Sequence, residues 1–101
     1  MQYLGVLRGA GTLECDDKPI AAVTYDLDGF LTRPGEVVAS GEVRATAAAL
    51  SDAFGRRDVH LRTEDGRILS VRFSGKRLNP ASDAAHVDVG GDLPPAKQWK
   101  R

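Results

Sequence analysis

The chain has 101 residues, of which 42% are apolar and 28% charged, and its 14 basic and 14 acidic side chains give a formal net charge of zero. This size and composition predict one small globular domain and leave little room for the large folds that hold cofactors. Balanced charge argues against a protein that binds through its overall electric field. The single cysteine, Cys15, excludes an intramolecular disulfide and a thiolate metal cage.

The first fifteen residues alternate apolar and polar side chains around glycines, which is typical of a strand and not of an export signal. No stretch of the sequence approaches the roughly 18 consecutive apolar residues that a membrane-spanning helix needs. We therefore expect a cytoplasmic protein that has no contact with a membrane and no cofactor.

Glycine and proline separate short segments in which apolar and polar residues alternate, and this period of two is the pattern of half-buried strands. The first two strands are expected over residues 2–9 and 11–15. Between them the string RGAG at 8–11 carries two glycines and no phosphate-loop lysine or serine. It is interpreted as the turn of a hairpin.

Two longer strands follow. The first is expected over residues 20–28, after DDKP at 16–19, whose aspartates and proline are typical of a turn. The second is expected from Glu36 to Arg44. The residues expected to face the core are Val23, Tyr25 and Leu27 on one strand, and Val37, Ala39 and Val43 on the other.

The string TAAALSDAFG predicts the one helix of the chain, over residues 46–54. Thr46 is a suitable N-cap, the alanines and Leu50 favour helix, and Gly55 supplies the stop. A helix of two or three turns is marginal in water, so we expect it to pack on the sheet or close one end of a barrel.

Residues 58–73, DVHLRTEDGRILSVRF, predict a hairpin. Its register follows from parity, that is, from the requirement that the apolar side chains of both strands point to the same face. A two-residue turn at Asp65-Gly66 would split the apolar residues between both faces of the hairpin. A three-residue loop, Glu64-Asp65-Gly66, keeps them together and places Gly66 at the left-handed position. The cross-strand pairs expected from this loop are Leu61 with Leu69, Val59 with Val71, His60 with Ser70 and Asp58 with Arg72.

A last strand is expected over 85–89, and DLPPAKQWKR at the end predicts a flexible tail over 92–101. For Trp99 two alternatives stay open, docking onto the body and exposure as a free docking group. Short antiparallel strands, frequent turns and one helix predict a mainly β fold. We expect a small antiparallel β-barrel, or a barrel-like sandwich, of six to seven strands with one short α-helix, as a single domain over 1–91.

The string YDLDGFLTRPGE at 25–36 resembles the nucleophile loop of haloacid-dehalogenase-type phosphatases. The resemblance implies that Asp26 accepts a phosphoryl group and Asp28 acts as acid and base, both near Mg²⁺. Phe30 stands where that family prefers Thr or Val, and the family's parallel sheet is not predicted here. Asp28-Gly29 is therefore interpreted as a turn. A metal-dependent phosphate hydrolase using this aspartate pair remains an alternative function.

Charge is distributed unevenly along the chain, with four basic and eight acidic residues over 1–55 and seven against three over 56–77. Basic side chains gather around the second hairpin, which makes a weak nucleic-acid binder a further alternative. Binding of single strands also needs exposed aromatic residues on which bases stack, and none is predicted in this region. Its one aromatic residue, Phe73, is expected to point into the core because of the alternation of faces along the strand. The basic residues concerned are Arg56, Arg57, Arg62, Arg67, Arg72, Lys76 and Arg77.

No set of nucleophile, base and electrophile is recognisable, and His60 and His86 lack the spacing of a metal pair. The sequence therefore predicts a non-enzymatic binding or assembly module of unknown ligand, with no catalytic and no metal-binding residue. Its partner would contact a face carrying His60, Arg62 and Arg72, or an open strand edge, and Trp99 is the remaining candidate binding residue. A homodimer is expected if a strand edge stays unpaired.

Overall fold

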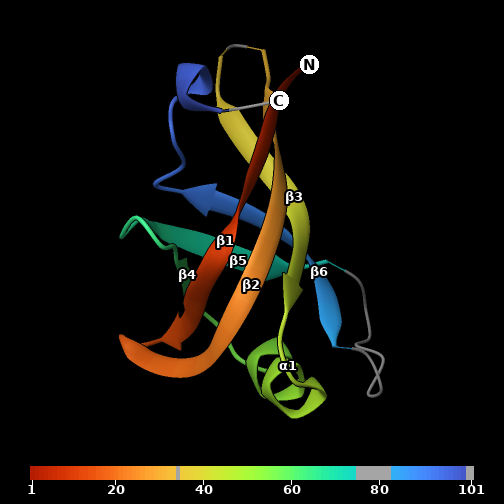
Figure 1. Ribbon diagram of the computed structural model, residues 1–101, viewed down its shortest axis with the longest axis vertical. Coiled ribbons are helices and arrows are strands. Elements are labelled where there is room, and N and C mark those ends of the chain that lie inside the picture. The colour runs from red at the N-terminus through yellow and green to blue at the C-terminus, as the bar shows by residue number, and fades with distance from the viewer. Residues whose placement is uncertain (34, 75–82, 100–101) are drawn as a thin grey trace.

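The computed structural model of the chain describes residues 1–33, 35–74 and 83–99. Six strands form a closed barrel in the order β1-β2-β3-β6-β5-β4, and every pair of neighbours is antiparallel (Figure 1). This confirms the predicted mainly β fold with one short α-helix. The strands are β1 (Gln2–Cys15), β2 (Lys18–Leu31), β3 (Val37–Arg44), β4 (Val59–Arg62), β5 (Ile68–Phe73) and β6 (Ala84–Gly91).

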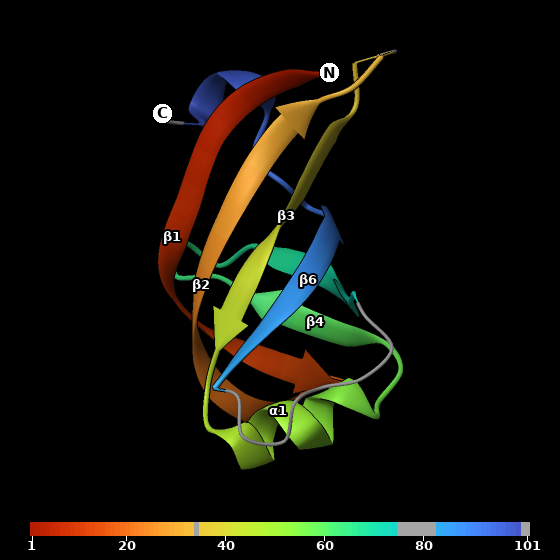
Figure 2. The same cartoon turned by 90° about the vertical axis from the view of Figure 1, so that its right-hand side faces the viewer.

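The two ends of the barrel are covered by different parts of the chain (Figure 2). The helix α1 (Ala47–Phe54) crosses one end, and the C-terminal segment with the short 3₁₀ helix η1 (Ala96–Gln98) lies at the other. The hydroxyl of Thr46 accepts a hydrogen bond from the Ala49 N–H at 3.2 Å, which confirms the predicted N-cap. Within the described ranges no helix has the length and apolar character to cross a bilayer.

The hairpin predicted at RGAG is wrong, because no turn interrupts the first strand there. Residues Gln2–Cys15 form one continuous strand, and Gly9 and Gly11 pair with Tyr25 and Val23 of β2. Glycine is needed here for a close approach and not for a turn. A Cβ added at Gly11 would lie 2.3 Å from the backbone oxygen of Arg62 on β4. The strand therefore bends against β4 where the barrel closes.

The turn predicted at Asp28-Gly29 is likewise wrong, because both residues lie inside β2. Asp28 pairs with Val6, and Gly29 pairs with Gly5 beside a register shift in β1. A glycine in a strand often marks a place where another group approaches the backbone closely. At Gly29 this group is the indole of Trp99, whose Cε3 would lie 2.7 Å from an added Cβ.

The first hairpin turn consists of two aspartates. Cys15 pairs with Lys18, so Asp16 and Asp17 alone connect β1 to β2, with φ angles of 53° and 62°. Positive φ at both central residues is the conformation of a type I′ turn, whose twist matches that of the flanking strands. The predicted DDKP turn is thus confirmed for its aspartates, while Lys18 and Pro19 already belong to β2.

The second hairpin has the register that parity predicted. Leu61 pairs with Leu69 and His60 with Ser70, and Gly66 has a φ of 86°. Within the three-residue loop, the carboxylate of Asp65 accepts a hydrogen bond from the Thr63 hydroxyl. That bond lowers the pKa of Asp65 against the opposing effect of its burial, with further lowering by Arg67. The described β4–β5 ladder ends at His60–Ser70, so it does not include the predicted pairs Val59 with Val71 and Asp58 with Arg72. Val71 and Arg72 pair with Val89 and Asp88 of β6, and Asp58 precedes β4.

The inward positions of all six strands form one apolar core. The residues predicted to face inward on the two long strands do so, and Val23, Tyr25, Leu27, Ala39 and Val43 are buried while Val37 is half-buried. Burial raises the pKa of the Tyr25 phenol, and the carboxylates of Glu64 and Asp65 raise it further against a lowering by the backbone of Glu64. The Phe73 ring packs on Phe54 of α1, with their centroids 5.6 Å apart.

Trp99 is docked on the barrel and is only 8% exposed. Its indole Nε1–H donates to the backbone oxygen of Pro94 at 3.0 Å. Arg67 holds the same segment from the second hairpin, because its Nη2 donates to Gln98 Oε1 at 3.1 Å. Mobility of the tail over 92–101 stays a prediction, and residues 100 and 101 lie outside the described residues.

Candidate functional site

The register of four strands aligns polar side chains on the outer face of the barrel. Arg8, Asp26, Glu42 and His86 are successive partners across β1, β2, β3 and β6. Directly opposed side chains on one face of a sheet lie roughly 5 Å apart, within reach of electrostatic interaction. The neighbouring row on the same face consists of Val6, Asp28, Ser40, Asp88 and Arg72.

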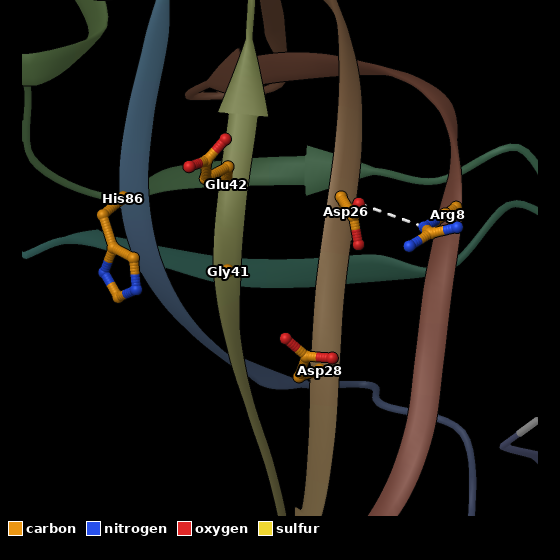
Figure 3. Close-up of a pocket in the computed structure, with 6 residues that line it drawn as sticks. All are labelled: Arg8, Asp26, Asp28, Gly41, Glu42 and His86. Atoms are coloured by element: carbon orange, nitrogen blue, oxygen red, sulfur yellow. Dashed lines mark hydrogen bonds and ion pairs between the residues drawn. The ribbon is translucent and has the colours of Figure 1, made fainter. Parts of the chain in front are cut away.

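Between these rows the surface forms a hollow of about 400 Å³, called here the acidic hollow. Figure 3 shows the side chains of Asp26 and Asp28 leaving β2, with Glu42 on β3 and His86 on β6. Its lining residues are Arg8, Asp26, Asp28, Gly41, Glu42 and His86. Three carboxylates and one guanidinium give this lining a formal charge of −2 when His86 is neutral.

Gly41 brings β3 close to β2 beneath the hollow. A Cβ at this position would lie 2.1 Å from the backbone oxygen of Asp26. Any larger residue would push the two strands apart and with them the carboxylates of Asp26 and Glu42, which are direct register partners. The glycine thus sets the spacing of the acidic side chains.

Each of the three carboxylates in the hollow, those of Asp26, Asp28 and Glu42, has a hydrogen-bond or ion-pair partner other than the other two carboxylates. Arg8 Nε donates to Asp26 Oδ2 at 3.0 Å, and the Tyr3 hydroxyl donates to Asp28 Oδ1 at 2.9 Å (Figure 3 shows the first). Glu42 pairs with Arg44 at 3.1 Å. The side chains of Arg8 and Asp26 are 67% and 52% exposed, so water screens this pair and it contributes little to stability. The carboxylates therefore remain accessible to another cation.

His86 closes the row on β6. Its Nδ1 is hydrogen-bonded to the Ser74 hydroxyl, and its backbone oxygen accepts from the Ser74 N–H at 3.0 Å. The first contact holds the ring beside Ser74, and the second fixes the backbone of His86. The arrangement offers positioned charge and hydrogen-bonding groups to a ligand.

The phosphatase resemblance gains no support from this geometry. Asp26 and Asp28 lie two residues apart on an antiparallel strand, whereas the family's nucleophile loop follows a strand of a parallel sheet. In the part of the chain that the structure describes, no three His, Cys, Asp or Glu side chains are arranged to hold a metal ion. Hydrolysis through this pair stays an untested prediction.

The four binding residues predicted from the sequence are only partly brought together. His60 and Arg62 lie on the outer face of β4 and pair with Ser70 and Ile68 of β5, and Arg72 lies two residues beyond Ser70 on the same face. His60 Nδ1 lies 3.0 Å from the backbone oxygen of Asp58, and Arg62 Nη2 lies 3.2 Å from Glu14 Oε1. Trp99 is buried on Gly29 at the end of the barrel, away from this face.

Several of the candidate arginines are engaged by carboxylates, while Arg56, Arg57 and Arg72 line one hollow together with Asp58. Arg67 pairs with Asp65 at 3.2 Å and Asp92 at 3.6 Å, and Arg56 pairs with Asp52. Such local neutralisation leaves less field to attract a phosphate backbone. Lys76 and Arg77, the other candidates for nucleic-acid contact, lie outside the described residues.

Cys15 lies in a different hollow, at the end near α1. Its Sγ donates to the backbone oxygen of Arg57 at 3.3 Å, and Asp52 and Arg56 line the same space. No histidine is among the lining residues that the structure describes there. Among these described residues, the cysteine therefore has no histidine with which to form a nucleophilic pair.

The acidic hollow was missed by sequence reasoning because four strands build it. The outward positions of residues 20–28 and 36–44 already carry Asp26, Asp28 and Glu42, so the pattern put acidic groups on one face. The sequence pattern could not predict the register of β2 against β3, nor the pairing of β3 with β6, which is distant in the sequence.

Electrostatics and geometry therefore describe an exposed acidic hollow on the outer face of a six-stranded barrel. Comparison of the chain with protein-family models, with curated proteins and with solved structures finds no match.

Proposed function

We propose that this protein is a non-enzymatic binding module that recognises a positively charged segment of a partner protein through the acidic hollow. The observation that carries the proposal is that Asp26, Asp28 and Glu42 all line one hollow of about 400 Å³. The partner face therefore differs from the basic face expected from the sequence, and the class of function, a binding module, stays the same.

The hollow suits the end of a lysine or arginine side chain. It is polar, it carries a formal charge of −2, and its floor is a rigid sheet held by the β2–β3 ladder. A cation entering it could pair with Asp28 and Glu42 without displacing Arg8 from Asp26. Because carboxylates accept several hydrogen bonds, their present neighbours leave acceptor capacity for an ammonium or guanidinium group.

Exposed charge pairs contribute about 0.2 to 1 kcal/mol each. The hollow alone therefore supports weak, salt-sensitive binding, which is typical of a module that contacts its partner at several places. The partner is identified here by charge, as a lysine- and arginine-rich segment.

The test is titration of the full chain with a short oligoarginine peptide by calorimetry at low and physiological salt. The double variant Asp28→Asn/Glu42→Gln keeps the shapes of both side chains and removes their charges. It should lower the affinity about three- to tenfold, the effect of losing two exposed charge pairs.

The matched control is Asp17→Asn, which removes one exposed carboxylate at the tip of the first hairpin and keeps a residue type that tolerates positive φ. This control should bind as the unchanged protein does. Equal binding by the double variant and the unchanged protein, or a loss as large in Asp17→Asn, would show that the hollow is not the site.

A further inference from the structure

The first strand is paired on both sides over only part of its length. β2 accompanies β1 from end to end, whereas β4 pairs with β1 only at Thr12–Cys15. In Figure 1, β4 accordingly runs beside only the lower part of β1. Among the described residues, the stretch before Thr12 has no strand on its second side.

One hydrogen bond shows which backbone groups face this open side. The N–H of Ala10 donates to Glu64 Oε1 at 2.9 Å, so it points away from β2. Backbone groups of an antiparallel strand point alternately to the two sides, and β1 keeps one register with β2 from Gly5 to Leu13. The N–H and C=O groups of Val6 and Arg8 therefore also point away from β2.

Within the described ranges these groups of Val6 and Arg8 have no hydrogen-bond partner. An unpaired strand edge of this kind is a template for another strand. The stretch carries few features that block pairing, since Arg8 is its only charged residue and its guanidinium is held by Asp26 on the same sheet.

From this geometry we propose that two copies of the chain pair antiparallel along this edge, with the two-fold axis beside Leu7. In this register Val6 of each copy faces Arg8 of the other, and every outward N–H and C=O of these residues finds a partner. Hydrophobic contact is added because the two Leu7 side chains are brought opposite each other on the inner face.

If the two-fold axis is moved by one residue in either direction, fewer of the outward N–H and C=O groups find hydrogen-bond partners. An axis at Arg8 opposes two like charges and leaves Val6 facing Ala10, whose N–H is already taken by Glu64. An axis at Val6 places Arg8 against Leu4, where the register of β1 shifts. The axis at Leu7 is thus the pairing that the edge fits best.

The pairing uses the backbone of β1 and stands whether or not the acidic hollow binds a partner. Because the interface consists chiefly of one strand pair, we expect a weak dimer that forms with rising protein concentration. Sedimentation equilibrium should show a shift from the 10.8 kDa chain mass towards twice that value. In parallel, amide hydrogen exchange at Val6 and Arg8 should slow as the dimer forms.

The decisive variant is Val6→Pro, which removes an N–H that β2 does not use and is tolerated on a strand edge. It should raise the dimer dissociation constant about tenfold or more, because two symmetric hydrogen bonds are lost. Val6→Lys tests the same contact through repulsion of the partner's Arg8 and covers the case in which the proline variant fails to fold.

The charge-matched control is Ala22→Lys, an exposed position on β2 opposite Thr12. It should dimerise as the unchanged chain does. A chain that stays monomeric up to about 1 mM, where even very weak association is visible, would overturn the proposal. So would a dimer that Val6→Lys leaves intact.

Discussion

At the tip of the first hairpin, Asp16 and Asp17 hold φ angles of 53° and 62°. Aspartate tolerates the left-handed region better than most residues, and alanine at such a position is disfavoured by roughly 1 kcal/mol relative to glycine. The turn also joins β1 to β2, which lie side by side in the polar face.

We predict that Asp17→Gly is more stable than Asp17→Ala by about 1 kcal/mol, because only glycine adopts positive φ without steric conflict. Urea unfolding of both variants measures the difference. At Ala22, inside β2, the order should reverse, and Ala22→Gly should lose about 0.5 to 1 kcal/mol relative to the unchanged chain. If glycine were favoured over alanine at both positions 17 and 22, or alanine at both, the result would contradict the type I′ conformation of the turn.

Gly29 is a contact residue for Trp99. A Cβ at this position would lie 2.7 to 2.8 Å from three carbons of the indole, so the ring has to move if one is added. We predict that Gly29→Ala shifts Trp99 fluorescence to longer wavelength, as the ring becomes exposed, and destabilises the fold by about 1 to 3 kcal/mol.

The matched control for this substitution is Gly90→Ala, where an added Cβ meets no atom within 4 Å. That variant should leave the fluorescence unchanged. An unshifted spectrum for Gly29→Ala would mean that the indole does not rest on Gly29 in solution.

Among the elements, the β4–β5 hairpin carries a loop carboxylate, Asp65, from which we expect a pH-dependent contribution to stability. The hydrogen bond from Thr63 holds the pKa of Asp65 below its usual value. A carboxyl whose pKa is lower in the folded chain stabilises the fold above its unfolded value of about 3.8, and this contribution disappears as the pH falls through the folded pKa.

We therefore predict that Asp65→Asn destabilises the protein at neutral pH, and that the difference from the unchanged chain shrinks as the pH falls below about 3.8 and is lost once the pH is below the folded pKa. Urea unfolding across this pH range measures it. In a Thr63→Val background the same substitution should have a much smaller effect, because the hydroxyl is the main cause of the lowered pKa. A pH-independent difference would show that the Asp65 charge does not stabilise the loop.

The sequence pattern predicted the loop of this hairpin and the pairs next to it, Leu61 with Leu69 and His60 with Ser70, and it failed on two other glycine-containing strings. Parity works for the hairpin because its loop is short and both strands bury one face, so Leu61 and Leu69 leave a single register. Gly11 and Gly29 were interpreted as turn residues since glycine marks both turns and close approaches. Only the groups that approach them, the Arg62 backbone and the Trp99 indole, distinguish the two cases.

The acidic hollow escaped prediction for a related physical reason. Alternation along a single strand shows that Asp26 and Asp28 share a face, but the local pattern contains no information on which strand lies beside it. Pairing of β3 with β6 spans the helix and the whole second hairpin. His86 enters the site only through that long-range contact.

For the whole molecule, the two proposals concern one continuous surface. Arg8 lines the acidic hollow, and its backbone lies on the open edge of β1. Antiparallel pairing along this edge extends the sheet and keeps the outer faces of both copies on the same side. A dimer would therefore present two hollows to one partner, and bivalent contact strengthens weak individual sites.

Closure of the barrel depends on the short β1–β4 seam, where Thr12–Cys15 pairs with four residues of β4. Gly11 lies at the start of the seam, and its lack of a side chain lets the Arg62 backbone approach closely. A Cβ added at Gly11 would lie 2.3 Å from the backbone oxygen of Arg62, which is too short a distance for any real contact. Backbone cannot move aside as a flexible side chain can. Separation of β1 from β4 is then the main way to relieve the clash.

We predict that Gly11→Ala destabilises the barrel by about 2 to 3 kcal/mol and that amide hydrogens of β4 lose exchange protection before those of β2 and β3. Gly55→Ala is the control, because Gly55 has a φ of −83° and an added Cβ there meets only Asp52 O at 4.0 Å. That control should be neutral or slightly stabilising. Equal stability of the two variants would mean that β1 and β4 do not approach as closely in solution as the barrel requires.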